Sequence, residues 1–406
     1  MRIHFCRPRV LNEKHNARSN RWKWTHRRAM VAVQVAVLMI VLLGFAALAI
    51  DVGHLCALKG ELQRAADAAA LAGVSAFADD SLRTTQYGEN SEQLTAAMAT
   101  EAAARTVQYA GLNTANGLAP ALGEGDVVVG SFDFNDPTAP LGVGGQPNAV
   151  QASARFTEDS PNGAVSNFLA QILGFPSSQV GATATAAFDD RFAGYTPDTP
   201  GVLTPFTIYV TEYETQRDNG PDNLSYDEDL DVVQNVGDGI REVRLFPYAD
   251  EGGGDGAGNF GLLNVGLTNM GVPGLRTQIL NGITPEEIEE EIGTSELTFV
   301  DGAGNPITHR ITGNPGMKGG TESAVEVRVG DVIGFFLHSS LVDGGSTATY
   351  TMAGLRFGRL MEVHLTGDPD QRRLVVQPVV YTDPGVRTDG QAPSSGGLIG
   401  RLVLVR

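Results

Sequence analysis

An unbroken run of apolar residues near the N-terminus dominates the hydrophobic pattern of the chain. Residues 29–50 hold one polar side chain, Gln34, and no charge. A helix of this length rises about 33 Å, which is enough to cross a hydrocarbon core of about 30 Å. The apolar region of a cleaved signal peptide is shorter, at roughly 7–15 residues. The run therefore predicts one transmembrane helix.

Residues 51–78 continue with good helix formers, so we expect the helix to extend beyond the membrane. Their apolar positions recur every three or four residues, which is the spacing of one helix face. This stripe consists of Leu55, Leu58, Leu62, Ala65, Ala66, Ala69 and Ala72. Because it is mostly alanine, the stripe allows close approach but buries little area. It suits docking against another helix better than standing alone in water.

Shorter periodic segments follow, up to about residue 190. Residues 92–110 form a second alanine-rich helical segment, whereas residues 127–134, 148–156 and 179–188 alternate like strands. Residues 164–173 have the pattern of an amphipathic helix. Antiparallel strands with helices on one face predict a small α+β layer.

Turn-forming residues at 189–205 separate this region from a glycine-rich, β-prone remainder. Helices are expected there at residues 274–281 and 284–292, the second with Thr284 as its cap and Glu287 at the capping-box position. Short strands at this spacing predict a β-sandwich or barrel-like domain with an inserted helical hairpin. The expected strands are residues 206–213, 241–246, 259–265, 296–300, 324–329, 332–338, 350–364, 374–381 and 398–405.

The fold class that these segments predict is α+β, with a mainly β C-terminal domain. We expect a basic head at residues 1–28 and the transmembrane helix at residues 29–50. A helical and α+β region would follow at residues 51–190, and the mainly β domain would occupy residues 206–406.

Charge is distributed unevenly along the chain. Residues 1–28 carry nine basic residues and one acidic residue, whereas the rest of the chain carries 20 basic and 46 acidic residues. The acidic body argues against nucleic-acid binding, because phosphate contacts need a positive surface. The positive-inside rule places the basic head in the cytoplasm and residues 51–406 outside. The lipid bilayer is therefore one predicted partner.

Asp51 and the segment that follows it carry a family resemblance. An apolar helix, an aspartate and then the run ELQRAADAAALAG at residues 61–73 resemble the N-terminal domain of TadE/TadG-like proteins of the bacterial Tad (tight adherence, Flp) pilus-assembly machinery. The resemblance is strongest over residues 27–77, and the order strand, strand, helix, strand beyond it is also similar to TadG. It implies a helix-docking motif made of Asp51, Glu61, Leu62, Gln63, Ala66, Asp67, Ala69, Leu71 and Gly73.

Two departures from related proteins narrow this resemblance. Type IV prepilins are cleaved after a glycine and have a glutamate five residues later, but this chain has Ala29 and Gln34 at the expected places. The metal motif Asp-x-Ser-x-Ser, which begins the von Willebrand factor A domain of some TadG-like proteins, does not occur in the sequence. A permanently anchored TadG-like protein is favoured over a polymerising pilin.

Motifs for catalysis are missing from the sequence, which has no Gly-x-Ser-x-Gly, His-Glu-x-x-His or Walker loop. Cys6 and Cys56 are the only cysteines, so the outer region can build neither a disulfide framework nor a cysteine zinc site. His309, His338 and His364 are interpreted as ordinary structural histidines, the last two at partly solvated strand ends. We therefore expect no enzymatic activity and no cofactor.

Acidic loops raise the question of calcium. Asp227, Asp229, Asp231 and Asp238 have a spacing similar to part of an EF-hand, but Val232 stands where the loop needs glycine. Residues 250–259 look like one copy of a calcium-binding nonapeptide repeat, and a lone copy cannot stack with neighbours. Solvated loops are the favoured interpretation, with the four aspartates as weak calcium candidates.

Taken with the resemblance, these patterns predict a non-enzymatic, membrane-anchored component of a Tad/Flp-type pilus assembly or secretion apparatus. The resemblance implies Tad/Flp assembly proteins or pilins as partners and the bacterial inner membrane as the location, with most of the chain periplasmic. The alternative is an anchored extracytoplasmic binding or sensing module, with weak calcium sites. An envelope enzyme is the third hypothesis, and it would need a convergent cluster of polar residues.

Overall fold

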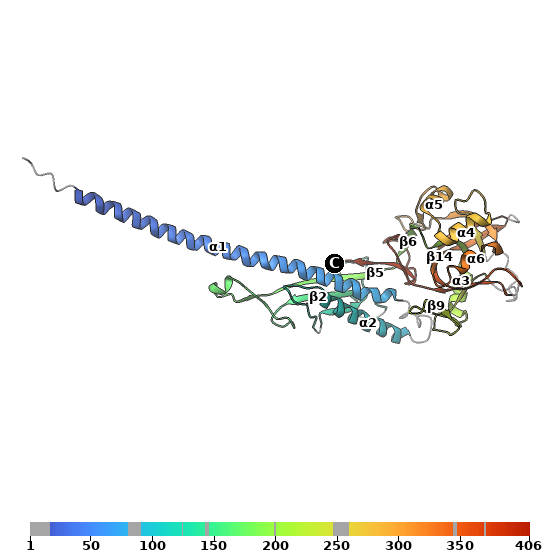
Figure 1. Ribbon diagram of the computed structural model, residues 1–406, viewed down its shortest axis with the longest axis horizontal. Coiled ribbons are helices and arrows are strands. Elements are labelled where there is room, and N and C mark those ends of the chain that lie inside the picture. Colours follow the sequence, from blue (N-terminus) through green and yellow to red (C-terminus); the bar gives the residue numbers. More distant parts are fainter. Residues whose placement is uncertain are drawn as a thin grey trace, which may run out of the picture. The chain divides into compact units, whose positions relative to one another are not determined.

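The computed structural model describes most of the chain and divides it into two compact units (Figure 1). One unit holds the chain up to Glu61 together with Arg155–Gly181, and the other holds Leu62–Ala154 together with Ala182–Arg406. The described residues are 17–79, 91–123, 125–142, 146–198, 200–246, 260–343, 347–368 and 371–406.

The predicted apolar helix and its extension form one continuous helix. Helix α1 runs over Ala17–Val74 and is followed by a short 3-10 helix, η1, at Ser75–Ala78. None of residues 31–50 is buried, whereas several residues from Leu58 onward are fully buried. By length and composition the helix is apolar enough to cross a membrane. The expected apolar helix and its continuation are confirmed.

A five-stranded sheet contains three strands that the alternation predicted. Its order is β1-β2-β5-β19-β17, and all neighbours are antiparallel except β17 and β19. The fourth strand comes from far along the chain, because β19 pairs with β5 between Arg401 and Asp189. The bounds are β1 Val127–Gly130, β2 Ala149–Phe156, β5 Val180–Asp189, β19 Ile399–Leu404 and β17 Tyr381–Thr382.

This sheet crosses the predicted boundary at residues 189–205, since β5 precedes that boundary and β19 follows it. The domain limits given above stay a prediction. Helix α2, at Ser91–Leu112, confirms the second alanine-rich helix.

The prediction of an amphipathic helix at residues 164–173 is wrong. The chain instead forms a small hairpin of β3 (Val165–Ser166) and β4 (Ser177–Ser178), with a single 3-10 turn, η3, at Ala170–Leu173 between them. The turn ends at Gly174, whose φ of 92° lies in the left-handed region that glycine adopts without strain.

The C-terminal region is a barrel-like β domain, which settles the choice left open between sandwich and barrel. Strand β14 pairs with β7 on one side and with β15 on the other, so the ring β15-β13-β11-β7-β14 closes on itself. Strands β16 and β10 extend the sheet beyond β15. The bounds are β7 Leu203–Tyr209, β10 Val243–Phe246, β11 Phe260–Leu263, β13 His309–Pro315, β14 Val332–Asp343, β15 Ala348–His364 and β16 Arg373–Pro378.

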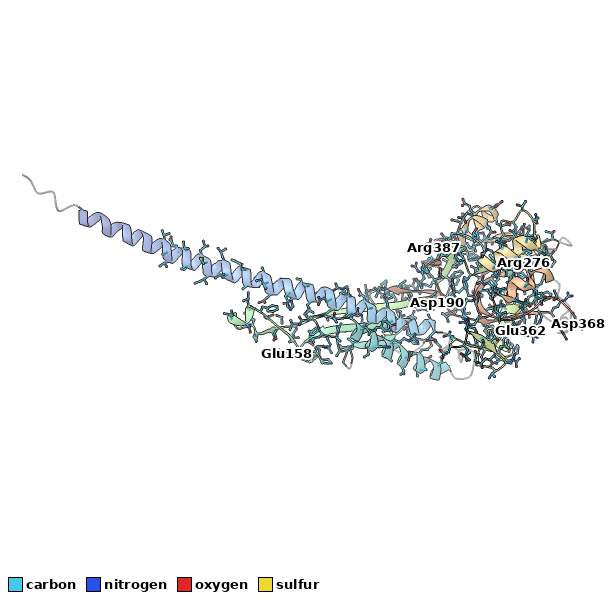
Figure 2. The ribbon with its side chains drawn as sticks, in the orientation of Figure 1. Glu158, Asp190, Arg276, Glu362, Asp368 and Arg387 are labelled. Carbon is cyan, nitrogen blue, oxygen red and sulfur yellow. The ribbon has the colours of Figure 1, made fainter. Side chains whose placement is uncertain are left out.

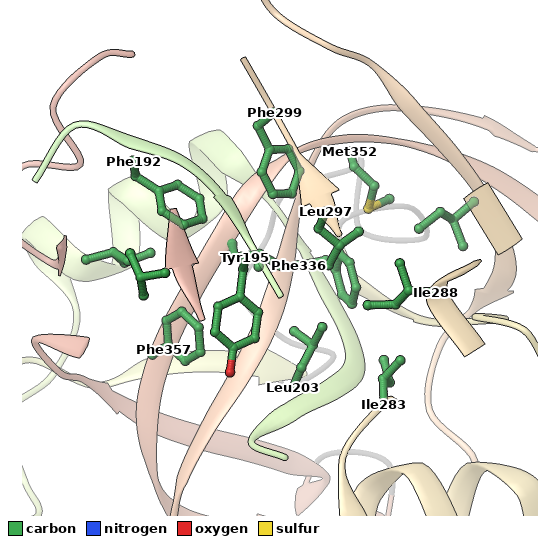
Figure 3. Packing of buried hydrophobic residues seen from close by; sticks show 14 of the residues in the cluster. Phe192, Tyr195, Leu203, Ile283, Ile288, Leu297, Phe299, Phe336, Met352 and Phe357 are labelled. Atoms are coloured by element: carbon green, nitrogen blue, oxygen red, sulfur yellow. The ribbon is translucent and has the colours of Figure 1, made fainter. Parts of the chain in front are cut away.

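Both faces of several of these strands are buried, among them β7, β11 and β16. Neighbouring residues of a strand point to opposite faces, so Phe335 and Phe336 enter different hydrophobic clusters. The cluster around Phe336 also contains Tyr195, Leu203 and Phe357 (Figure 3). A three-stranded sheet of β6 (Phe192–Tyr195), β12 (Leu297–Thr298) and β18 (Val386–Thr388) contributes to this cluster.

Two helices of the domain were predicted correctly. They are α4 at Val272–Asn281 and α5 at Pro285–Ile292. Thr284 Oγ1 accepts a hydrogen bond from the backbone N–H of Glu287, and the Glu287 carboxylate accepts one from the N–H of Thr284. The expected capping box is therefore present.

Two strand predictions in the same domain are wrong in part or in whole. The strand expected at residues 206–213 ends at Tyr209, and the chain continues as helix α3, Val210–Asn219. The strand expected at residues 324–329 is instead helix α6, Glu322–Glu326, followed by a turn. Tertiary contacts override local β-propensity at both places.

Candidate functional site

The candidate site is the part of α1 that begins where the apolar run ends. Asp51 is the first residue after that run and is only 4% exposed. Its carboxylate accepts hydrogen bonds from three consecutive backbone N–H groups, those of Phe168 (2.9 Å), Leu169 (3.1 Å) and Ala170 (2.5 Å). These amides open the η3 turn, so a side chain of α1 performs the role that an N-cap residue performs for its own helix.

A second residue of α1 contacts the same turn. The imidazole of His54 lies three positions after Asp51 and meets the Phe168 ring edge-on, with 5.1 Å between centroids. Residues three apart on a helix share one face. Asp51 and His54 together therefore attach the β3–β4 hairpin to α1.

The hairpin is also held from within. Asn167 donates from its backbone N–H to the carbonyl of Pro176 and from its side chain to the carbonyl of Phe175. Its side-chain oxygen accepts a hydrogen bond of 2.9 Å from Ser178 Oγ. These bonds close the loop between the two strands into one conformation.

Further along, the alanine stripe of α1 is buried except at Leu55 and Ala72, which are half-buried. Leu62, Ala65, Ala66, Ala69 and Ala70 have no exposed surface. This part of α1 also has a hydrogen bond to the five-stranded sheet, in which Gln63 Nε2 donates to the Thr183 carbonyl of β5 at 3.4 Å. Small side chains let the helix backbone approach the sheet closely.

Gly73 marks the tightest contact of this face. A Cβ at Gly73 would overlap Thr106 Oγ1 of α2 and would lie 3.0 Å from both the Ala102 carbonyl oxygen and Val150 Cγ1 of β2. Thr106 cannot swing away freely, because its hydroxyl donates to the Ala102 carbonyl at 2.7 Å. Glycine is required here by close packing of α1 against α2 and β2.

Charged side chains close the end of the α1–α2 contact. Arg105 of α2 binds Asp79, donates to Glu101 at 2.8 Å and donates to Ser75 Oγ at 3.3 Å. Burial acts to lower the pKa of Arg105, but the bonds to Glu101 and Asp79 outweigh it and raise the pKa. The guanidinium thus stays charged and ties α2 to the segment after α1.

The predicted docking motif therefore faces the chain's own sheet and second helix over much of its length. Leu62, Ala66, Ala69 and Gly73 are buried, while Glu61, Gln63, Asp67 and Leu71 are half-buried. Asp67 accepts a hydrogen bond of 2.8 Å from Gln63. Docking of a partner helix by this motif stays a prediction. Open apolar surface of α1 lies at residues 31–50, where a Cβ on Gly44 would meet nothing within 4 Å.

Three of the four calcium candidates lie at or beside the hairpin of β8 (Ser225–Asp227) and β9 (Val232–Gln234). The Asp227 carboxylate accepts the N–H groups of Asp229 and Leu230 and the side-chain amide of Gln234. Asp231 accepts from Tyr226 Oη, and Asp238 accepts from Ile240 N–H and from Gln377.

Within the residues that the structure describes, no group of three or more His, Cys, Asp and Glu side chains is placed to hold a metal. The calcium hypothesis stays a prediction, and residues 250–259 lie outside the described residues.

The three outer histidines occupy different surroundings. His338 lies inside β14, not at a solvated strand end as expected, and is 1% exposed. Its Nδ1 pairs with Thr207 Oγ1 at 2.9 Å. His309 Nε2 contacts the Thr298 carbonyl at 2.7 Å, and His364 ends β15 near Glu362. His309 and His338 flank Met352 of β15 from the two neighbouring strands, whereas His364 lies at the far end of β15. Glu362, the neighbour of His364, is labelled in Figure 2.

The contact between Asp51 and residues 168–170 was not found from the sequence. One signal was present: no charged residue occurs at positions 160–188, although the chain is acidic overall. An uncharged segment of this length points to an environment that disfavours charge.

Comparison with known families identifies the same segment. Residues 31–76 match the Tad family of Flp pilus-assembly TadE/G-like proteins. The match covers the apolar helix, Asp51 and the whole alanine-rich run, and it confirms the resemblance over this segment. No curated protein and no solved structure matches the chain.

Proposed function

We propose that this protein is a non-enzymatic, membrane-anchored component of a Tad/Flp-type pilus assembly or secretion apparatus. One observation carries the proposal: the segment that matches the TadE/G-like family also contains an apolar helix, none of whose residues from 31 to 50 is buried by the chain. A lipid bilayer, alone or with partner helices, would cover that surface.

The proposed orientation is a cytoplasmic N-terminus and an extracytoplasmic body. Its support is the nine basic residues at positions 1–28 and the scarcity of basic residues after the helix. Single cysteines at Asn12 and at exposed Asn219, in a Cys6→Ser/Cys56→Ser background, test it with a membrane-impermeant maleimide. Asn219→Cys should react on intact spheroplasts and Asn12→Cys only after permeabilisation. The reverse pattern would overturn the orientation.

Partners would reach α1 through its exposed apolar part rather than through the buried alanine face. A photo-crosslinking residue at Phe45, which is 66% exposed, should capture Tad-type pilins or inner-membrane assembly proteins in membranes. The same crosslinker at Leu62 is the matched control, because that side chain is fully buried by its own chain. There the products should be intramolecular.

Two outcomes decide the proposal. Recovery of Tad-type proteins from the Phe45 position, and not from the Leu62 position, supports a place in the assembly machine. An isolated anchored protein at both positions overturns it and favours an anchored binding or sensing module.

A further inference from the structure

The loop between β3 and β4 presents apolar side chains to the outside. Phe168 is 57% exposed, Ile172 is 78% exposed and Phe175 is 66% exposed. Three large apolar side chains within eight positions form a patch that water disfavours. We define these three side chains as the hairpin tip.

The loop that carries the hairpin tip has a fixed backbone conformation, because it is hydrogen-bonded both to α1 and across the loop itself. Asp51 accepts the three amides at residues 168–170, and Asn167 bonds to Phe175 and Pro176 across the loop. The apolar side chains therefore point outward from a loop held by its polar groups, an arrangement that preorganises them for an apolar surface.

The position of the hairpin tip relative to the apolar helix is set within one compact unit. Asp51 directly follows residues 31–50, and its carboxylate bonds directly to the amides of the tip loop. Figure 1 shows the loop, in green, beside α1. If residues 29–50 span the hydrocarbon core, the tip lies at the height of the lipid headgroups.

Charge points to the same environment. No charged residue occurs between Asp159 and Asp189. The carboxylate of Asp51 is hydrogen-bonded to backbone amides. Interfacial segments bury Phe, Trp and Leu side chains about 5–10 Å into the boundary between headgroups and acyl chains. Two phenylalanines and one isoleucine fit that layer.

We propose that the hairpin tip inserts into the headgroup layer of the same bilayer that the apolar helix crosses, as a second membrane contact. This inference rests on the proposed anchoring by α1. The two contacts, joined by Asp51, would fix how the start of the outer region is oriented against the membrane surface.

Site-specific fluorescence in vesicles tests this contact. The full chain, in a Cys6→Ser/Cys56→Ser background, is reconstituted into vesicles of phosphatidylethanolamine and phosphatidylglycerol. An environment-sensitive NBD dye is attached at Ile172→Cys, at Leu42→Cys within the apolar helix, and at Val327→Cys. Val327 is the matched control, because it is also an aliphatic residue and is 74% exposed, but lies in the β domain.

The expected result is a blue-shifted Ile172 signal that a nitroxide near the headgroups quenches more strongly than one at the bilayer centre. Leu42 should be quenched most by the central nitroxide and Val327 by neither. Quenching at Leu42 without quenching at Ile172 overturns the tip contact while the anchor stands. A blue shift at Ile172 that appears only when a second copy or another protein is present also overturns the tip contact. Loss of quenching at Leu42 overturns the anchor itself.

Discussion

The carboxylate of Asp51 accepts a hydrogen bond of 2.5 Å from the backbone N–H of Ala170, across 119 positions of the chain. Together with the bonds from Phe168 and Leu169, it joins the end of the apolar helix to a distant hairpin. The first residue outside the predicted membrane segment therefore has a structural role that needs its negative charge, because hydrogen bonds to an ionised acceptor are the stronger ones.

Asp51→Asn should loosen the hairpin, although the substituted side chain has nearly the same size. The amide can still accept one bond but lacks the charge, so the backbone N–H groups of residues 168–170 should exchange with solvent several times faster. Hydrogen exchange of the full chain in detergent measures this. Asp67→Asn is the control, because the structure pairs that carboxylate with Gln63 on the same helix. Equal exchange in both variants would argue against the role of Asp51.

Gly73→Ala should destabilise the contact of α1 with α2 by about 1–3 kcal/mol, since overpacking forces neighbouring atoms to move. The added methyl group overlaps Thr106 Oγ1 and crowds Val150. Gly60→Ala, on the same helix with nothing within 4 Å of its Cβ, should stabilise the helix by up to about 1 kcal/mol.

The thermal midpoint of the full chain in detergent measures both effects: it should fall in Gly73→Ala and rise in Gly60→Ala. Adding Thr106→Ala to Gly73→Ala should recover part of the loss, because it removes the overlapping hydroxyl. A harmless Gly73→Ala would contradict the packing described here.

Alkaline pH should weaken the β domain through two tyrosines. Tyr195 Oη and Tyr381 Oη lie 3.3 Å apart, and the Tyr381 ring stacks on Phe357 at 3.7 Å. Burial raises the pKa of Tyr195 to about 12, and burial also raises the pKa of Tyr381. Because an unfolded tyrosine ionises near about 10, the native state favours the neutral form.

The stability that Tyr195 contributes is therefore complete below about pH 10 and is lost as the pH rises toward about 12. The contribution of Tyr381 is likewise complete below about pH 10 and falls as the pH rises, because its pKa is also raised. For Tyr195 the loss is roughly 3 kcal/mol, from about two units of pKa at about 1.4 kcal/mol each. Phenolate absorbance recorded during alkaline unfolding checks this. The Tyr195→Phe/Tyr381→Phe variant should unfold with a weaker pH dependence, and an unchanged profile would contradict the assignment.

Calcium should leave the β8–β9 hairpin unaffected. Asp227 already accepts two backbone N–H groups and the Gln234 amide, so its carboxylate serves the turn. Asp227→Ala should make the hairpin more sensitive to proteolysis, equally with calcium and with a chelator. A calcium-dependent rise in the thermal midpoint that Asp229→Asn or Asp231→Asn abolishes would instead establish a site, because a ligand stabilises the state it binds.

Helices with strong local signals were predictable from the sequence. The apolar run and the alanine-rich stretch after it define α1, and Thr284 with Glu287 defines the start of α5. In each case the deciding residues lie within the element itself or directly before it. Local periodicity and capping are sufficient there.

Segments decided by distant contacts were not predictable. Residues 164–173 have a helical pattern, but Asp51 binds the amides of residues 168–170 and only one turn forms. Residues 324–329 alternate like a strand, yet Arg328 donates to the Ile279 carbonyl at 3.0 Å from within a helix-and-turn segment. The candidate site shares this limit, because the alanine stripe indicated a docking face but could not identify its own sheet as the partner.

The pairing of β19 with β5 has a consequence for the order in which the protein folds. Strand β5 ends at Asp189, and β19 begins at Ile399, so the ribosome completes all five strands of the ring β15-β13-β11-β7-β14 before the missing neighbour of β5 exists. Until then β5 offers an unpaired edge, which invites pairing with other chains. Completion of the five-stranded sheet must therefore wait until β19 has been synthesised. In that interval, the nascent protein would be most dependent on a chaperone that shields strand edges.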